Sequence, residues 1–417
     1  MKRLPATRVF YALEFVLSMP SFTLIAVYFV RDVHMTPLEL ILVGTVMETT
    51  LFFCEIPTGA FADVYGRRLS VIVSFFVTGS AVILLGAVPN FYAICLAWAV
   101  WGFGYTFRSG AYQAWLVDEV GVGRAAGLFL RGQRLAYAGG LVGLALGVAI
   151  ALWNLRVAVI AGGALEVAAA VACLVFMPET GFAPRPRSER GGAARELARA
   201  ARSGARYVRV QPFLLLVFGA VFVAGVSSEA FDRLTEAHFI RDVGLPRVGD
   251  LDPVVWFALF GASVLVVGLV ASTVLVRRFD EASAPRLARA LFWLTAVLIA
   301  TEFVFALAGS IALALLALVT VGLARSLISP LYMAWLNRQI HDSSVRATVI
   351  SISGQADAIG EAGGGPFLGL VGNAWGIRAA LATGAALLVG ALGLWGKVVR
   401  DGGEEPELET LPAPEAA

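Results

Sequence analysis

The stretch Phe53-Cys-Glu-Ile-Pro-Thr-Gly-Ala-Phe-Ala-Asp-Val-Tyr-Gly-Arg-Arg68 lies where a long apolar run ends and charged residues begin. Its spacing follows the pattern G-x-x-x-D-x-x-G-R-R, formed by Gly59, Asp63, Gly66, Arg67 and Arg68. Gly59 permits the close approach of a neighbouring helix, as small residues do within membranes. Gly66 can adopt the left-handed conformation that ends a helix. The charged residues then lie at a membrane surface, where they can form an ion pair that breaks and re-forms.

The composition around this stretch is that of a polytopic membrane protein. Charged residues make up 15% of the 417 residues and hydrophobic residues 59%, whereas a soluble domain has about 25% charged residues. One aqueous core cannot bury so much apolar surface. A membrane span needs about 20 apolar residues, and we expect twelve spans, near 9–31, 38–62, 69–89, 91–116, 126–152, 156–177, 212–238, 253–276, 287–308, 311–336, 348–372 and 377–397. Cys54, Cys95 and Cys173 fall inside these spans and are expected to be buried thiols, without disulfides or metal.

An internal repeat divides the spans into two halves. The segment Tyr112-Gln-Ala-Trp-Leu116 recurs 220 residues later as Tyr332-Met-Ala-Trp-Leu336. At an offset of 222 residues, Gly143 and Gly147 correspond to Gly365 and Gly369. Matches in the same order at nearly one offset indicate a duplication, so we expect two six-helix domains, residues 1–177 and 212–397.

The segments outside these domains are expected to lie in the cytoplasm. In the linker 178–211, the residues Arg195, Arg199, Arg202, Arg206 and Arg209 share one helical face. We expect a basic amphipathic helix on an anionic inner leaflet; a solvated tether is the alternative. The acidic segment 398–417 is expected to be a disordered tail.

The basic residues predict the orientation in the membrane. With the N-terminus in the cytoplasm, 24 of the 32 lysines and arginines lie inside, five lie outside and three lie within spans. This satisfies the positive-inside rule with both termini cytoplasmic, and an odd number of spans would break the pattern. We expect a multi-pass protein of a bacterial cytoplasmic membrane, without a cleavable signal peptide because Glu14 interrupts the first apolar run.

The motif and the repeat together carry a family resemblance. The motif follows the second apolar span and resembles the conserved loop between helices 2 and 3 of major facilitator superfamily transporters, with Val64 at a position that is usually basic. Parallel six-helix halves are also the arrangement known for that superfamily. The resemblance implies an all-α membrane protein with twelve transmembrane helices in two pseudo-symmetric bundles. It also implies secondary transport by alternating access, driven by a proton gradient and without a cofactor.

The resemblance also implies roles for the motif residues. The motif arginines are expected to pair with an acid at the inner end of helix 4, Asp118 or Glu119, and with the inner start of helix 11. Such pairs would hold the outward-facing state closed on the cytoplasmic side. The alternative is a static staple of the loop that aids insertion and folding.

Helix 5 resembles the antiporter motif G-x6-G-x3-G-P-x2-G-G of drug exporters. The matching residues are Gly132, Gly139, Gly143 and Gly147, while Leu144 replaces the proline and Val148 the last glycine. Helix 11 has Gly365, Pro366 and Gly369 in the equivalent place. In the family's fold these residues permit tight contact between helices 5 and 8 and between helices 2 and 11, and proline adds a kink. The motif favours export over uptake; ordinary glycine packing, which implies no direction, is the alternative.

Ionisable residues within the spans are candidates for proton coupling, because burying charge in a membrane is costly. We expect Arg108 to share a protonatable network with Glu14 or Glu55; the alternative is a fixed ion pair joining helices 1, 2 and 4. Glu229 and Arg233 can pair along helix 7, near Asp232. These residues lie toward the outer end of the helix, where they are expected to form an outer gate or a cation-attracting vestibule; a local pair that neutralises itself is the alternative. On helix 11, Asp357 and Glu361 share one face and are expected to form a proton or cation site, with Arg325 as partner. Further ionisable residues within the spans are Glu48, Glu166, Glu236 and Glu302.

These observations predict a proton-coupled secondary transporter that exports a small amphipathic or drug-like molecule. Proton-coupled uptake of a metabolite, a membrane enzyme and a non-transporting receptor are the alternatives. No nucleotide-binding loop G-x-x-x-x-G-K-[ST] is present, and His34, His238 and His341 are too scattered to predict a metal centre. The expected partners are the substrate and the bilayer, with no nucleic acid, and we expect a monomer. Aromatic residues that could line the substrate cavity are Trp98, Trp101, Tyr105, Tyr112, Trp256, Phe257, Trp293 and Tyr332.

Overall fold

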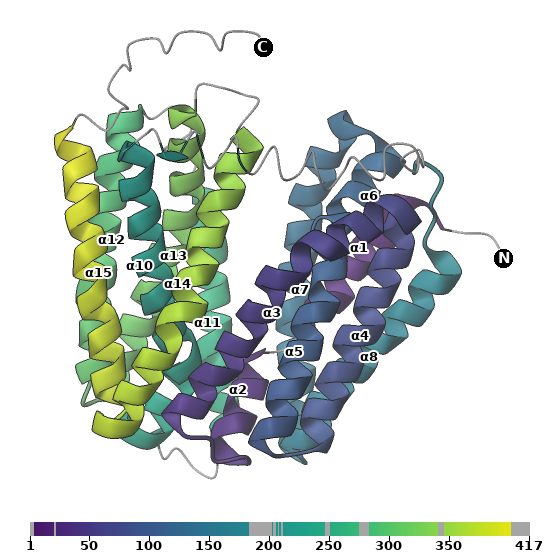
Figure 1. The fold of residues 1–417 in the computed structure, drawn as a ribbon. Coiled ribbons are helices and arrows are strands. Elements are labelled where there is room, and N and C mark those ends of the chain that lie inside the picture. Colours follow the sequence, from purple (N-terminus) through teal and green to yellow (C-terminus); the bar gives the residue numbers. More distant parts are fainter. Residues whose placement is uncertain are drawn as a thin grey trace, which may run out of the picture.

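The computed structural model consists of two groups of helices (Figure 1). It describes residues 4–20, 22–182, 202, 206, 208, 209, 212–246, 251–274, 283–340 and 346–401. The first bundle contains α1 (Ala6–Leu17), α2 (Phe22–Arg31), α3 (Pro37–Tyr65), α4 (Arg67–Ala87), α5 (Phe91–Arg108), α6 (Ala111–Val120), α7 (Val122–Ala151) and α8 (Leu155–Phe176). The second contains α10 (Pro212–His238), η1 (Phe239–Val243), α11 (Pro253–Val274), α12 (Ala284–Leu307), α13 (Ile311–Gln339), α14 (Arg346–Trp375) and α15 (Ile377–Arg400). The expected linker helix lies largely outside the described residues, and so does the tail from residue 402.

Each of the twelve expected spans coincides with helix, although two spans are broken. Within the described residues, eight helices are long and apolar enough to cross a membrane by themselves. The first span was expected to be continuous but ends at Leu17, because Pro20 has no N–H and its ring disfavours helix before it. The fourth span breaks after Arg108, where Gly110 has a φ of +74°. Glycine adopts this conformation without steric cost, so α6 can start in a new direction.

Local sequence signals explain where other helices start. Thr36 Oγ1 accepts a hydrogen bond from the backbone N–H of Glu39, and the Glu39 carboxylate accepts one from the backbone N–H of Thr36 at 2.8 Å. These two hydrogen bonds form a capping box at the start of α3, with Pro37 at its first position.

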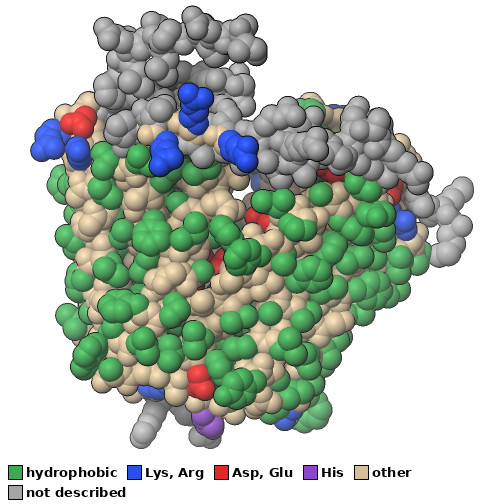
Figure 2. All heavy atoms as spheres, viewed as in Figure 1, with side chains coloured by type: hydrophobic (Ala, Val, Ile, Leu, Met, Phe, Trp, Pro, Cys, Tyr) green, Lys and Arg blue, Asp and Glu red, His purple; other side chains and the backbone are tan. Residues whose placement is uncertain are grey.

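The sequence repeat has a structural counterpart in each bundle. In the first, the rings of Tyr112 and Trp115 are stacked with centroids 6.1 Å apart; in the second, those of Tyr332 and Trp335 are stacked at 6.5 Å. Both tryptophans are fully buried. Figure 2 shows hydrophobic side chains over the middle of the visible face and basic side chains toward its two ends. The chain is a multi-pass membrane protein whose apolar middle faces lipid.

The two bundles meet at one end and diverge at the other (Figure 1). We call the end that carries α6 and Gly66 the motif end. At the opposite end, Arg31 Nη1 lies 2.9 Å from Asp252 of the second bundle, and the backbone N–H of Leu38 donates to Asn373 at 2.9 Å. At the motif end, a Cβ added to Gly59 would meet no described atom within 4 Å. The expected close helix contact at Gly59 is therefore wrong for this conformation, because the bundles diverge there.

The glycines of α7 contact a different helix from the one expected. A Cβ at Gly139 would overlap the backbone of Phe15, and one at Gly143 would overlap the backbone of Met19. These glycines let the first span lie directly on α7 within one bundle, so the expected contact of helices 5 and 8 through them is wrong. Gly147 likewise faces Leu24 of α2.

The glycines of α14 pack as expected. Gly365 faces Ile41 and Gly369 faces Leu38, both on α3 of the other bundle. Pro366 lies inside α14 between them. These small residues hold the bundles together opposite the motif end.

Candidate functional site

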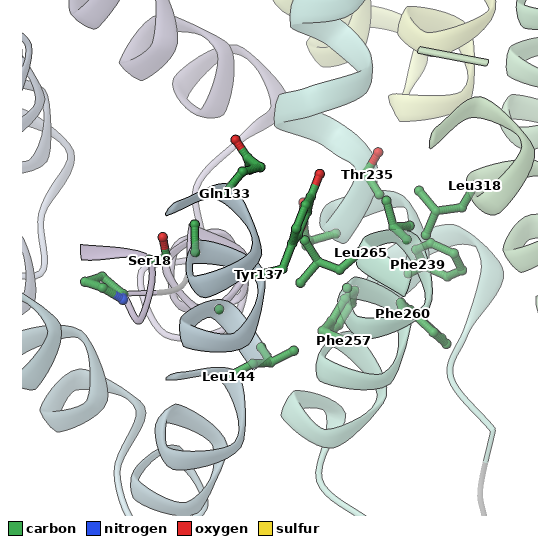
Figure 3. A pocket seen from close by; sticks show the side chains of 16 residues that line it. Ser18, Gln133, Tyr137, Leu144, Thr235, Phe239, Phe257, Phe260, Leu265 and Leu318 are labelled. Carbon is green, nitrogen blue, oxygen red and sulfur yellow. The ribbon is translucent and has the colours of Figure 1, made fainter. Parts of the chain in front are cut away.

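A cavity of about 510 Å³ lies between the two bundles. Figure 3 shows Gln133, Tyr137 and Leu144 of α7 across from Thr235, Phe257 and Phe260 of the second bundle. Glu236 also lines this cavity. The lining is mostly aromatic and aliphatic with a few polar groups, as in most small-molecule sites.

A second cavity of about 350 Å³ adjoins the first at Glu236, which lines both. Phe29, Trp98 and Trp101 form part of its wall, opposite charged residues of α10. Of the aromatic residues expected to line a cavity, Trp98, Trp101 and Phe257 do so, and the ring centroid of Trp256 lies 6.3 Å from that of Phe260, which lines the first cavity. Trp293 is 66% exposed on the outer surface, which fits a lipid-facing position.

Arg325 on α13 connects three helices of the second bundle. Its Nη1 lies 2.5 Å from Asp232 on α10 and its Nη2 lies 3.2 Å from Glu302 on α12. The guanidinium also lies over the Phe231 ring, 4.8 Å from the centroid. Arg325 was expected as the partner of Asp357 and Glu361. It acts on Asp357 through a charge interaction at longer range, while its guanidinium binds the acids of α10 and α12 directly. The described charged groups that act on Glu361 do not include Arg325.

The predicted pair along α10 is confirmed. Arg233 Nε lies 3.1 Å from Glu229 Oε1, and the Glu229 side chain is 3% exposed. This pair lies against Gly44 of α3, where any Cβ would overlap both side chains. Gly44 thus allows the first bundle to cover a buried ion pair of the second.

Acidic groups outnumber basic groups in this region. Among the described residues, the interacting acids are Glu48, Glu229, Asp232, Glu236, Glu302, Asp357 and Glu361, and the interacting bases are Arg233 and Arg325. Glu361 accepts a hydrogen bond from Ser228 Oγ at 3.3 Å, and the charged groups that act on it are acidic. Since like charges repel in a low-dielectric interior, protonation or a bound cation would relieve the cluster.

The charged groups of the first bundle are arranged differently from the expected network. Arg108 lies between the rings of Tyr105 and Phe75, with centroids at 4.9 and 5.4 Å, and the carboxylate acting on it is Glu166 of α8. Thr78 donates a hydrogen bond to Glu166. The network was expected to include Glu14 or Glu55.

Glu14 and Glu55 bind other partners. Glu14 interacts with the Tyr112 hydroxyl, and Glu55 accepts a hydrogen bond from Ser109 Oγ at 3.1 Å. The carboxylate that acts on Arg108 is thus Glu166, whereas Tyr112 interacts with both Arg108 and Glu14. Identifying Glu166 required knowledge of which helices pack together, which the sequence pattern alone does not provide.

The motif residues form contacts within the first bundle. Arg67 Nε lies 2.6 Å from Asp118 of α6, and Arg67 Nη2 lies 4.0 Å from Asp63. Gly66 has a φ of +112°, which only glycine adopts readily, although its ψ of 144° differs from the expected left-handed helical value. The described residues contain no ion pair between the motif arginines and α14.

Arg68 binds the end of α8 and the start of the interdomain linker instead of an acid on α6. Its Nη2 donates to the carbonyl oxygen of Leu174 at 2.6 Å, and its backbone N–H donates to Glu179 at 2.9 Å. Glu119 in turn accepts hydrogen bonds from the backbone N–H and the hydroxyl of Thr180. The motif therefore connects α3, α6 and the end of α8.

Sequence reasoning missed several cavity residues. The sequence pattern does not distinguish Glu236 from the other acids of its helix, and it predicts no role for Gln133 or Tyr137. Their common signal is their place on α7 and α10, facing the space between the bundles. No group of three or more His, Cys, Asp or Glu side chains in the described ranges could hold a metal ion.

Comparisons with known proteins agree with this architecture. The sequence pattern of the Major Facilitator Superfamily matches residues 10–356. A stretch of 91 residues is 35% identical to an uncharacterised MFS-type transporter, YxaM, of Bacillus subtilis (strain 168); it covers 21% of this chain and only 22% of that protein.

Solved structures resemble the chain along nearly its whole length. The nucleoside transporter NupG superimposes with a TM-score of 0.74 at 11% identity, covering 94% of this chain and 99% of that one. A bacterial homologue of the human lysosomal transporter Spinster, in an inward-facing and unoccupied conformation, gives 0.70 at 15% identity, covering 95% and 96%. A POT family transporter in complex with 5-aminolevulinic acid gives 0.73 at 11% identity, covering 95% and 96%. At these identities the likeness shows the fold alone.

Proposed function

This chain belongs to the Major Facilitator Superfamily, and on that premise we propose that it is a proton-coupled secondary transporter that exports a small amphipathic molecule. The observation that carries the proposal is the cluster of acids around Arg233 and Arg325, which lies beside the inter-bundle cavities. Acids within a membrane protein are costly, and they mark ion and proton pathways. Alternating access requires both substrate and proton to reach such a site from either side.

The proposed orientation places the motif end in the cytoplasm of a bacterial cell. The excess of arginines on that side supports it, since cytoplasmic loops are enriched in basic residues. In this orientation the bundles diverge toward the cytoplasm and meet on the outside, which corresponds to an inward-facing state (Figure 1). The resemblance of helix 5 to the antiporter motif supports export over uptake.

We propose Asp357 and Glu361 as the proton-carrying pair. They share one face of α14 and lie among other acids, so the loss or gain of a proton there changes the charge of the whole cluster. The ion pairs of Glu229, Asp232 and Arg325 contribute to the electrostatic potential at this proton-carrying pair.

Flux in proteoliposomes tests the function. We expect a substrate found by screening toxic compounds to accumulate only when a proton gradient is present, and a pH-sensitive dye inside the vesicles to report proton movement in the opposite direction. Asp357→Asn and Glu361→Gln should abolish accumulation but keep exchange of substrate without a gradient. Glu39→Gln is the matched control, because glutamine also completes the capping box of α3.

Three outcomes would contradict the proposal. Accumulation that persists after the gradient has been collapsed excludes proton coupling. Proton and substrate movement in the same direction would replace export with uptake. Chemical conversion of a lipid without flux would indicate an enzyme.

If the motif acts as a gate, substitutions in it should reduce transport without reducing the stability of the fold. Arg67 and Asp118 are each about a quarter exposed, and partly exposed ion pairs contribute about 0–1 kcal/mol to folding. Arg67→Gln and Asp118→Asn should therefore change the melting temperature little, yet reduce transport at least tenfold if the pair stabilises a closed cytoplasmic side. The exchange of Arg67→Asp with Asp118→Arg should restore part of the rate. Equal losses of stability and transport would instead support a static staple.

A further inference from the structure

We infer that the transported molecule is an organic cation with an aromatic or alkyl body, and that Glu236 binds its charge. The inference rests on the proposed function, because it names the substrate class of the same cavity. Three observations carry it: the position of Glu236, the partners of its neighbours and the walls on either side.

Glu236 occupies the junction of the two cavities. It lines the cavity of about 510 Å³ and that of about 350 Å³. Its Oε2 is buried and has no hydrogen-bond partner among the described residues. A buried carboxylate oxygen without a partner loses hydration and gains nothing in return. A ligand that brings a positive charge to this point would supply the missing interaction.

The neighbouring charged groups already have partners. Asp232, one turn before Glu236 on α10, binds Arg325. Arg233 also lines the second cavity, but it binds Glu229. Both arginines are thus engaged with carboxylates, so they offer little positive charge to an anionic ligand. The remaining acidic excess repels anions and attracts cations.

The walls of both cavities suit an apolar cation. Trp98 and Trp101 lie beside Glu236 in the second cavity, and Tyr137, Phe257 and Phe260 line the first. The face of an aromatic ring attracts a cation within about 6 Å of its centroid, most strongly for tryptophan. Apolar walls also favour the body of the ligand.

The volumes and the ligating groups of the two cavities fit an organic cation better than a small inorganic cation. Calcium requires 6–8 oxygen ligands, whereas Glu236 is the carboxylate shared by the two cavities and the surrounding groups are mainly aromatic. Volumes of 350 and 510 Å³ fall in the range of about 300–1,000 Å³ that holds drug-sized ligands. A ligand with its charge at Glu236 can extend its body into either cavity.

Equilibrium binding to the purified full chain in detergent tests this inference without any gradient. Tetraphenylphosphonium and tetraphenylborate have the same shape and opposite charge, so their comparison isolates the sign of the charge. We expect the phosphonium to bind at least tenfold more tightly than the borate, and Glu236→Gln to weaken phosphonium binding at least tenfold. Glu236→Asp should keep part of the affinity, and Glu39→Gln, outside both cavities, should bind as the unsubstituted chain does.

Three results would overturn the inference. The first is equal binding of the two probes, and the second is undiminished phosphonium binding by a folded Glu236→Gln variant. The third is that neither the phosphonium nor ethidium, a second aromatic cation, binds. Gel filtration and a melting curve establish that the variant is folded, and retained binding in Glu236→Asp separates a role in binding from a role in folding. Proton-coupled flux of an uncharged compound alongside absent cation binding would overturn this inference and leave the proposed function intact. Tight cation binding without proton-coupled flux would overturn the proposed function and leave this inference intact.

Discussion

A covalent bridge between positions 31 and 252 is expected to reduce transport to the rate of protein-free liposomes. Arg31 Nη1 and Asp252 lie 2.9 Å apart and belong to different bundles, at the end where the bundles meet. Opening of that end requires these residues to separate, because their ion pair joins the two bundles there. A bridge therefore holds the molecule with its motif end open, and the substrate cannot be released on the other side.

The experiment uses Arg31→Cys with Asp252→Cys and a short bifunctional methanethiosulfonate reagent. Cys54, Cys95 and Cys173 are first replaced by serine or alanine, so that the two new thiols are the only targets. Transport should return when a reductant cleaves the bridge. The single-cysteine variants serve as controls and should keep most of their rate, because each partner of the Arg31–Asp252 pair is about a third exposed and such pairs stabilise by about 0–1 kcal/mol. If mass spectrometry shows a complete bridge while transport continues at full rate, the rocking of the bundles is not required.

The architecture could be predicted from sequence because its signals are local or periodic. Hydropathy located the spans, and the repeat of residues 112–116 at 332–336 placed corresponding elements in each bundle. The capping box at Thr36 and the pair of Glu229 with Arg233 were predictable for the same reason. In each case the two partners lie within four residues on one element, so their geometry follows from the helix itself.

Partners on different helices could not be predicted in this way. Arg108 was assigned to acids at a similar depth, but depth does not specify which face of a helix meets which neighbour. The close packing of α4 on α8 brings Glu166 and Thr78 together beside it. Arg325 likewise binds acids of α10 and α12, and the sequence distance to them carries no information about this contact.

Gly59 shows a further limit, which is conformational. A glycine that permits close packing is in contact only in those states where the neighbouring helix is present. In this structure the bundles diverge at the motif end, so Gly59 has open space around it. A sequence motif that serves an alternating mechanism therefore predicts contacts of more than one state, and one structure contains only part of them.

Replacement of Arg325 is expected to have the largest effect on stability and transport together. Its guanidinium binds Asp232 and Glu302, and the Glu302 side chain is 3% exposed. Removing one partner of a buried ion pair leaves an uncompensated charge and costs about 3–5 kcal/mol. Because Asp232 is 52% exposed toward the cavity, the loss in Arg325→Gln should lie near 3 kcal/mol, with transport at least a hundredfold lower.

A compensating variant separates charge from packing. Arg325→Gln combined with Asp232→Asn and Glu302→Gln removes the cation and both carboxylates while keeping hydrogen-bonding side chains of similar size. Since the cost in the single variant comes from unpaired negative charge, the triple variant should recover most of the lost melting temperature. Transport should stay low in both, because Asp232 and Arg325 also set the charge beside the cavity and the proposed proton site. Recovery of stability without recovery of proton-driven flux would show that Arg325, Asp232 and Glu302 serve the coupling of proton and substrate movement. A triple variant as unstable as Arg325→Gln would show instead that Arg325 stabilises the protein through its packing on Phe231 and not through its charge.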